Sequence, residues 1–295
     1  MKFSNEEYKK LQPLLFSIGY RLLGSVKDAE DAVQEVFLRG YEMDGDGVEN
    51  KKAYLCKMMT NRCLDIIKSA QYKREQYIGP WLPEPLVTGE GGDMDPAEML
   101  IEKEGLSISY LRMMENLVPH ERAVLLLREA FRFSYAEIAS FVDKREDYCR
   151  QLYRRAKKKL SAVEKESLDF ERNKTMVQRF ISAFQSENIE ELLGLLSEEV
   201  TLYSDGGGKV KAAVRPIISR NRVLSFIKGV MNQTTEKVSV FIREVNYQPA
   251  IVFFLNGKLH SVVSFYICKE TIKEIYLIMN PDKLPLKKFM LEGGF

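Results

Sequence analysis

Two short amphipathic helices are predicted between residues 134 and 160 from the spacing of apolar positions. The apolar side chains are Tyr135, Ile138, Ala139 and Val142 in the first helix, and Cys149, Leu152, Tyr153, Ala156 and Leu160 in the second. Because both sets recur at intervals of three and four residues, each helix has one face suited to a core. Two such helices around a short break are the pattern of a helix-turn-helix, whose second helix enters the major groove of DNA.

The face of the second helix opposite its apolar stripe is cationic. It carries Arg150, Arg154, Lys157 and Lys158, and the helix opens with Arg145 and Glu146. Guanidinium and ammonium groups on such a face suit phosphates and guanine edges, and the first residues of the helix are placed to reach bases. We therefore expect these side chains to contact duplex DNA. The alternative is a solvated basic helix without a ligand.

Another amphipathic helix, predicted over residues 28–38, has the opposite charge. Its apolar stripe is Ala29, Ala32, Val33, Val36 and Phe37, and its other face carries Asp28, Asp31, Gln34, Glu35 and Leu38. An exposed leucine among carboxylates favours a contact with another protein. The alternative is an ordinary surface helix with acids near its N-terminus, where the helix dipole stabilises them.

Residues 53–69 are predicted to form a helix with one apolar and one polar face. The apolar face holds Leu55, Met58, Met59, Cys63 and Ile66. The side chains expected to contact DNA, in this helix and shortly after it, are Asn61, Arg62, Lys68 and Arg74. Asp65 would repel phosphate, so we expect it to pair with Lys68 or Arg62.

A proline- and glycine-containing stretch, residues 77–96, interrupts the helical pattern and includes the only tryptophan. Proline fixes an extended path and removes a hydrogen-bond donor, so a stiff apolar segment is expected at Trp81, Leu82, Pro83, Glu84 and Pro85. The tryptophan either packs on the nearest domain or acts as a docking element.

From about residue 170 onward the pattern predicts a separate domain. Helices are expected around residues 177–184, at 189–196 and at 220–231, and strands at 200–205, within 251–268 and at 271–279. Asn256 and Gly257 form the favoured two-residue turn of a hairpin. Helices followed by strands predict an α+β fold with a curled antiparallel sheet.

A glycine run in this domain comprises Asp205, Gly206, Gly207, Gly208 and Lys209. A phosphate loop would need a hydroxyl after the lysine, but Val210 follows. The glycines instead permit positive φ angles and close approach of another backbone. A plain flexible turn is the alternative.

The composition agrees with a soluble protein of two or three domains. The chain has 295 residues, of which 45% are hydrophobic and 29% charged, with a net charge of +2. This total conceals one acidic and one basic helix. No apolar run is long enough to span a bilayer and the first residues lack the apolar core of a signal peptide, so a cytoplasmic location is expected. The four cysteines form no CxxC pair, and residues 44–50 lack the ligand set of a calcium loop, so we expect free thiols, no metal and no cofactor.

Together and in this order, these segments resemble the bacterial sigma factors of the extracytoplasmic-function class. Residues 28–38 look like the region 2 helix that docks on the clamp of core RNA polymerase. Residues 53–69 look like the next helix, which handles the promoter minus-ten element with the preceding loop, residues 44–50, where a flipped base is captured. Residues 117–160 look like region 4, whose last helix reads the minus-thirty-five element. The resemblance implies core RNA polymerase and promoter DNA as partners.

A subgroup of this class carries a WLPEP linker, a DGGGK motif, an NPDKL segment and a SnoaL-like C-terminal domain. This chain has these motifs at residues 81–85 and 205–209, and at Asn280, Pro281, Asp282, Lys283 and Leu284. The resemblance implies that the C-terminal domain contacts the linker and regulates the protein in place of a separate anti-sigma protein. Such domains are cones that often enclose a pocket, so a small-molecule ligand is a further partner to test. The tail after residue 284 is expected to cover a neighbour or close the cone.

The expected organisation is therefore multidomain: region 2 at 1–76, the linker at 77–104, region 4 at 105–166 and the SnoaL-like domain at 167–295. Two all-α domains precede an α+β domain. The expected function is promoter-specific transcription initiation without catalysis, because no pair of acids emerges in the cone at a useful spacing. The alternatives are a one-component regulator whose cone binds a small molecule, and a SnoaL-like isomerase or cyclase with a DNA-binding appendage.

Overall fold

The computed structural model describes residues 4–42, 50–74, 77–88, 106–160, 168–233 and 238–284, with the backbone alone for 70–74 and 231–233. The expected base-capturing loop at 44–49, the linker beyond Thr88, the tail after Leu284 and the side chain of Arg74 lie outside these residues. The chain divides into a helical unit and a mixed unit, and residues 77–88 belong to the mixed one. The segments expected as region 2 and region 4 pack together in the helical unit, whereas residues 77–88 of the expected linker pack in the mixed unit. The four-part division expected from the sequence therefore stays a prediction about functional regions.

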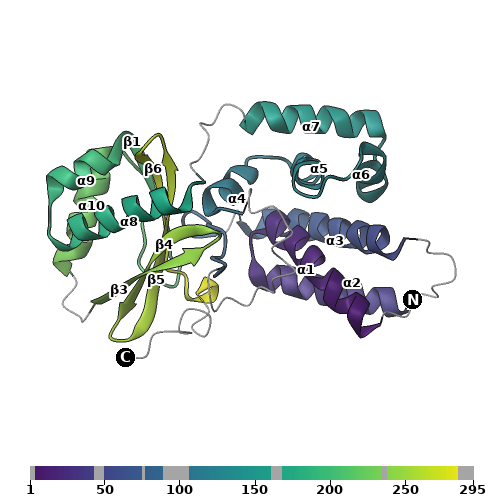
Figure 1. Cartoon of the computed structure of the whole chain (residues 1–295), viewed down its shortest axis with the longest axis horizontal. Helices are drawn as coiled ribbons and strands as arrows, with labels where there is room; N and C mark the ends of the chain where they lie inside the picture. Colours follow the sequence, from purple (N-terminus) through teal and green to yellow (C-terminus); the bar gives the residue numbers. More distant parts are fainter. Residues whose placement is uncertain are drawn as a thin grey trace. The chain divides into compact units, whose positions relative to one another are not determined.

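The helical part of the chain contains seven helices within the described residues (Figure 1). They are α1 Asn5–Leu23, α2 Val26–Glu42, α3 Lys51–Arg74, α4 Ile108–Met114, α5 Pro119–Glu129, α6 Tyr135–Val142 and α7 Glu146–Leu160. A capping box of Ser4 and Glu7 begins α1, and Gly24 ends it in the left-handed conformation, with φ of 68°. These caps fix the tight turn into α2.

A single apolar core joins the first three helices to α5, α6 and α7. Buried side chains of this core include Leu22 on α1, Met59 on α3, Leu125 on α5 and Phe141 on α6. A charged side chain also bridges the two parts: the buried Arg122 on α5 donates from Nη1 to the carbonyl oxygen of Leu22 and from Nε to that of Met114, both at 2.9 Å. The segments that resemble region 2 and region 4 are therefore packed on one another.

The helix-turn-helix expected from the sequence is confirmed in α6 and α7. Ser134 and Glu137 form a capping box at the start of α6, and Asp143 ends the helix with φ of 52°. The turn then leads into Glu146, the first residue of α7. Cys149, Leu152 and Ala156 are buried, as their spacing predicted.

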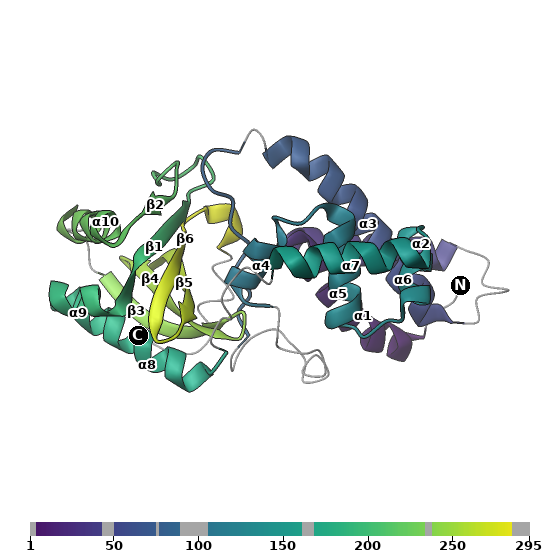
Figure 2. The same cartoon turned by 90° about the horizontal axis from the view of Figure 1, so that it is seen from above.

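The mixed unit combines three helices with a six-stranded sheet (Figures 1 and 2). The helices are α8 Phe170–Gln185, α9 Ile189–Leu195 and α10 Arg220–Gln233; the strands are β1 Leu196–Asp205, β2 Ile217–Ile218, β3 Val238–Val245, β4 Gln248–Leu255, β5 Lys258–Cys268 and β6 Thr271–Ile278. The sheet order is β2-β1-β6-β5-β4-β3. Asn256 and Gly257 form the expected hairpin turn, with φ of 50° and 77°. The α+β fold is confirmed, and β1–β2, β3–β4, β4–β5 and β5–β6 pair antiparallel as expected, while β1 pairs with β6 in parallel.

Each face of the sheet has its own cover. Helices α8, α9 and α10 lie on one face (Figure 2), over a core that includes Ile251, Val263 and Phe265. Alternate residues of the same strands, such as Val252 and Val262, point to the opposite face, since successive side chains of a strand alternate. There the cover includes Leu82 and Val87 of the linker together with Leu284. The linker is thus part of the fold of the mixed unit.

Candidate functional site

The acidic face predicted on residues 28–38 is exposed on α2. Asp28, Asp31 and Gln34 are exposed, and the hydroxyl of Ser25 accepts from the Asp28 N–H at 3.2 Å, which stabilises the start of the helix. Leu38 is 63% exposed, and Tyr41, one turn later, is 47% exposed. The sequence interpretation missed Tyr41, although its spacing of three from Leu38 places it on the same face. Apolar and acidic groups together suit a protein partner.

Glu35 behaves differently from the other members of this face. Its carboxylate oxygens lie 2.6 Å from Arg39 of the same helix and 2.6 Å from Arg62 of α3. A side chain expected to bind polymerase is therefore paired with one expected to bind DNA. Further along α3, Lys68 lies 3.5 Å from Asp65, which confirms the local pair expected there. Asn61 is half-buried and Lys68 is exposed.

The cationic face of α7 is exposed as predicted. The exposed members are Arg145, Arg150, Arg154, Lys157 and Lys158, and Glu146 is half-buried. Lys157 lies 3.4 Å from the carboxylate of Glu129 on α5, so its charge is partly balanced within the unit. At the start of α7 a surface hollow is lined by Asp143, Lys144, Arg145 and Tyr148. The sequence interpretation did not include Lys144 and Tyr148. Only their position could have indicated them, because they lie beside Arg145 and Glu146 at the start of the helix.

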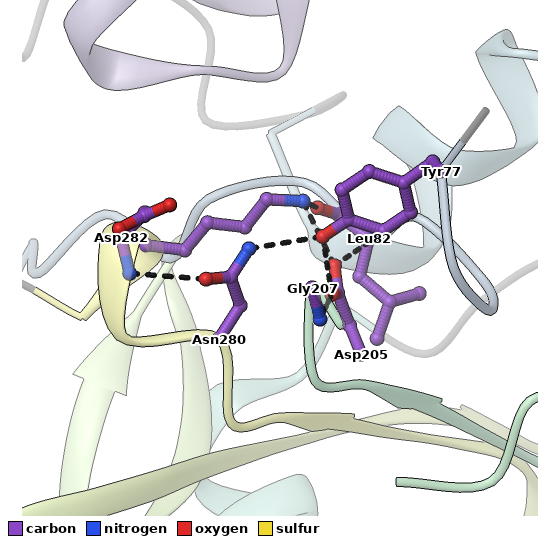
Figure 3. Close-up of polar contacts among 7 residues, drawn as sticks. Tyr77, Leu82, Asp205, Gly207, Asn280 and Asp282 are labelled. Atoms are coloured by element: carbon purple, nitrogen blue, oxygen red, sulfur yellow. Dashed lines mark hydrogen bonds and ion pairs between the residues drawn. The ribbon is translucent and has the colours of Figure 1, made fainter. Parts of the chain in front are cut away.

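A buried carboxylate, Asp205, organises the contact between the linker and the end of β1 (Figure 3). Its side chain has no solvent exposure. Oδ1 accepts from the Tyr77 hydroxyl at 2.5 Å and from the Gly207 N–H at 3.1 Å. Oδ2 accepts from the Leu82 N–H at 2.9 Å and from the Lys283 ammonium at 2.8 Å. Four donors thus converge on one carboxylate, as a buried charge requires.

The ammonium of Lys283 completes this cluster, which we call the linker clamp: Tyr77, Leu82, Asp205, Asn280 and Lys283. Besides Asp205, it donates to the Leu82 carbonyl oxygen at 2.5 Å, and it lies 4.0 Å from the centroid of the Trp81 ring. The linker, the DGGGK turn and the NPDKL segment are therefore in contact, as the sequence interpretation expected.

The apolar anchor of the linker is not the residue that the sequence favoured. Trp81 is half-buried beside the ammonium, whereas Leu82 is fully buried and Pro83, Glu84 and Pro85 are buried after it. Tyr77 was missed altogether. Burial, and then the hydrogen bond to Asp205, raise the pKa of its phenol, so the hydroxyl stays protonated and donates. Its own oxygen accepts from Asn280 Nδ2 at 2.9 Å.

The glycines after Asp205 allow the close approach that the sequence predicted. Gly207 and Gly208 have φ of 61° and 71°, and a Cβ added to Gly207 would lie 2.3 Å from Asn280 Nδ2. Gly206 has the same constraint, because an added Cβ would lie 2.3 Å from the Val210 carbonyl oxygen. Lys209 instead faces solvent and pairs with the exposed Asp282 at 2.6 Å.

A second set of contacts holds the linker further along. Val87 bridges to Val245, the Thr88 N–H donates to the Glu244 carbonyl oxygen at 3.1 Å, and the Asn246 N–H donates to the Leu86 carbonyl oxygen at 2.8 Å. The backbone of the linker therefore extends the sheet edge at the end of β3.

Two segments of the chain match known protein families. Residues 8–72 match sigma-70 region 2 and residues 107–160 match sigma-70 region 4. The extracytoplasmic-function (ECF) RNA polymerase sigma factor SigJ of Mycobacterium tuberculosis is 33% identical over 230 residues, which cover 77% of this chain and 73% of SigJ. The chain belongs to the extracytoplasmic-function sigma factor family. This sigma factor directs transcription initiation, and its two sigma-70 regions imply RNA polymerase and promoter DNA as partners.

The similarity to this family extends into the C-terminal domain. A probable ECF sigma factor, SigI of Mycobacterium tuberculosis, is 28% identical over 287 residues, 95% of this chain and 94% of SigI. The crystal structure of SigJ superimposes with a TM-score of 0.78 and 27% identity, covering 96% of this chain and 100% of that one. The family is not enzymatic. Among the described residues of this sigma factor, no helix has the length and apolar character needed to cross a membrane.

Proposed function

We propose that the mixed unit regulates this sigma factor by clamping the segment that joins its two promoter-binding regions. The observation that carries the proposal is the linker clamp, in which Asp205 and Lys283 hold both the N–H and the carbonyl oxygen of Leu82. A segment whose backbone and side chains are both bound cannot change its path without losing these contacts. The C-terminal domain acts in this way as a regulator, with no catalytic role.

The sign of the regulation follows from the helical unit. Regions 2 and 4 share one core there, whereas two promoter elements at a fixed spacing require the regions to lie apart. A clamped linker restricts how far regions 2 and 4 can separate. The clamp therefore favours the arrangement in which the two regions share a core over the promoter-bound arrangement, in which they lie apart. Release of the clamp is therefore expected to increase initiation.

Run-off transcription with purified core RNA polymerase tests this proposal. The full chain is expected to bind core polymerase stably and to initiate at defined start sites, and variants of the linker clamp are expected to initiate more often. A chain that binds promoter DNA but never core polymerase would instead be a one-component regulator. The small-molecule ligand of the cone gains no support from the described residues, and the cytoplasm remains the expected location.

The exposed face of α2 is proposed to dock on core polymerase through Asp28, Asp31, Gln34, Glu35 and Leu38. Reversing one charge and truncating the leucine, Asp31→Lys with Leu38→Ala, is expected to weaken binding at least tenfold, because both the charge and the apolar contact are lost. Titration of labelled core polymerase measures the affinity. Glu6→Lys, a charge reversal at an exposed residue of a different helix, α1, is the matched control; equal affinity of the double variant and the control would contradict the assignment.

The cationic face of α7 is proposed to read the upstream promoter element, with Asn61, Arg62, Lys68 and Arg74 serving the downstream one. Arg150→Ala or Arg154→Ala is expected to relax the preference for one base pair by about 5- to 100-fold, as a bidentate guanine contact is lost. Lys157→Ala or Lys158→Ala should weaken all sequences alike and lower the salt slope by about one. Binding to single-base promoter variants measures both. Unchanged base preference in both arginine variants would remove them from the reading face.

A further inference from the structure

Tyr135, the first residue of α6, lies against two guanidinium groups. The Cζ of Arg150 on α7 is 4.4 Å from the centroid of its ring, and the Cζ of Arg128 on α5 is 5.0 Å from the same centroid. Both distances are within the range of a cation–π interaction. One half-buried ring thus connects the reading helix to the helix packed beneath it.

The ring is held from several sides. Arg128 donates from Nη1 to the Phe133 carbonyl oxygen at 2.9 Å, which fixes the guanidinium against the loop before α6. The Tyr153 ring meets the Tyr135 ring edge-on, with centroids 6.0 Å apart. Tyr153 in turn donates its hydroxyl to Glu129, and burial of the phenol, together with this hydrogen bond, raises its pKa to about 12. Residues from α5, α6 and α7 therefore build a rigid platform.

Arg150 is the exposed end of this platform. Its side chain is 50% exposed, and its Nη2 lies 2.5 Å from the Glu146 carboxylate one turn earlier. A guanidinium has five N–H donors, so this pair and the ring face leave donors for a guanine edge. An unrestrained arginine would lose much of its rotamer freedom on binding, whereas a stacked and paired one has lost it already.

We propose that Tyr135 is a positioning residue, which orients Arg150 for readout of the upstream element through the face of its ring. The inference rests on the proposed role of Arg150 in base recognition. It adds a physical reason why Arg150 would prefer one base pair over the others. It assigns to the ring a role in specificity, because the guanidinium that it holds contacts bases and not only phosphates.

The test compares aromatic and aliphatic replacements in the full chain. Tyr135→Leu and Tyr135→Met remove the ring face, and Tyr135→Phe keeps it. Binding to duplexes with every single-base change in the upstream element is measured for each variant, for Arg150→Ala and for Tyr135→Leu with Arg150→Ala. The aliphatic variants should lose about 5- to 20-fold of the preference at the same base pair that Arg150→Ala affects, within the range of one bidentate contact. Tyr135→Phe should keep it, and the double variant should match Arg150→Ala.

The outcomes separate the two proposals. If Arg150→Ala leaves every base preference unchanged, its role in base recognition fails, and the inference fails with it. If Arg150→Ala relaxes one position but both aliphatic variants retain it, the positioning role of Tyr135 is overturned alone. Equal weakening on all sequences in the aliphatic variants would also overturn it, because that is the effect of a loosened helix. Additive losses in the double variant would show that the two residues act independently.

Discussion

Asp205→Asn is expected to destabilise the mixed unit by about 3–5 kcal/mol, the usual cost of removing one partner of a buried ion pair. All four groups that meet this carboxylate, from Tyr77, Leu82, Gly207 and Lys283, act as donors to it. An amide in its place must turn its own NH₂ group toward two of them, and it leaves the ammonium without a counter-charge. The linker should then detach from the end of β1, and initiation by core polymerase should rise.

A matched exposed pair provides the control for this substitution. Asp282 pairs with Lys209 through an ion pair of the same type, but their side chains are 61% and 54% exposed. Asp282→Asn is therefore expected to change stability by less than about 1 kcal/mol. Denaturant unfolding followed by Trp81 fluorescence measures both variants, since the only tryptophan lies beside the Lys283 ammonium.

Two results would contradict the regulatory role of the clamp. If Asp205→Asn detached the linker, as judged by quencher access to Trp81, and run-off transcription stayed at the parent level, the mixed unit would be an independent passenger. If transcription fell although the protein remained folded, the clamp would support the initiating arrangement instead of opposing it.

Arg122→Met is expected to loosen the packing of region 4 on region 2. The side chain is 5% exposed and makes two charge-assisted bonds, to the carbonyl oxygens of Leu22 and Met114. Methionine fills much of the space but donates nothing, so both carbonyl oxygens lose a charged donor, although that of Met114 still accepts from the Leu117 N–H at 3.1 Å. At about 1.5–3 kcal/mol for each hydrogen bond to a charged group, the loss of both is expected to cost roughly 3–6 kcal/mol.

Hydrogen exchange locates the effect of Arg122→Met. Amides of α5, α6 and α7 should exchange faster, while those of the mixed unit keep their parent rates. Arg179→Met is the control, because Arg179 is 54% exposed and its pair with Glu191 lies at the surface of the other unit. Unchanged protection of α5 in Arg122→Met would show that apolar packing alone joins the two regions.

The local elements were predictable from the sequence, but several of their partners were not. Three-and-four spacing predicted α6 and α7, and Asn256 with Gly257 predicted the hairpin of β4 and β5. The parallel pairing of β1 with β6 was missed, because local periodicity does not say which distant strands become neighbours. The same reason hid the pair of Glu35 with Arg62 on the adjacent helix and the common core of regions 2 and 4.

The candidate linker contact was predictable through its motifs and not through its chemistry. Trp81 attracted attention because it is large and unique, yet Leu82 is the side chain that is fully buried. Tyr77 lies four residues before the motif, and nothing in its neighbourhood indicates that its hydroxyl meets a carboxylate 128 residues away. Side-chain size alone is a weak guide to which member of a rigid segment points inward.

The distance in sequence between the two halves of the linker clamp has a consequence for the newly made protein. Leu82 and Lys283 are separated by 201 positions, so the linker leaves the ribosome long before the groups that bind it. At roughly 5–20 residues per second, the delay is about 10–40 seconds. Both sigma-70 regions are complete once residue 160 has been made, so they exist without the clamp only for the last part of that interval, roughly 6–25 seconds. A chain that stopped during that time would keep this unclamped state for its whole lifetime.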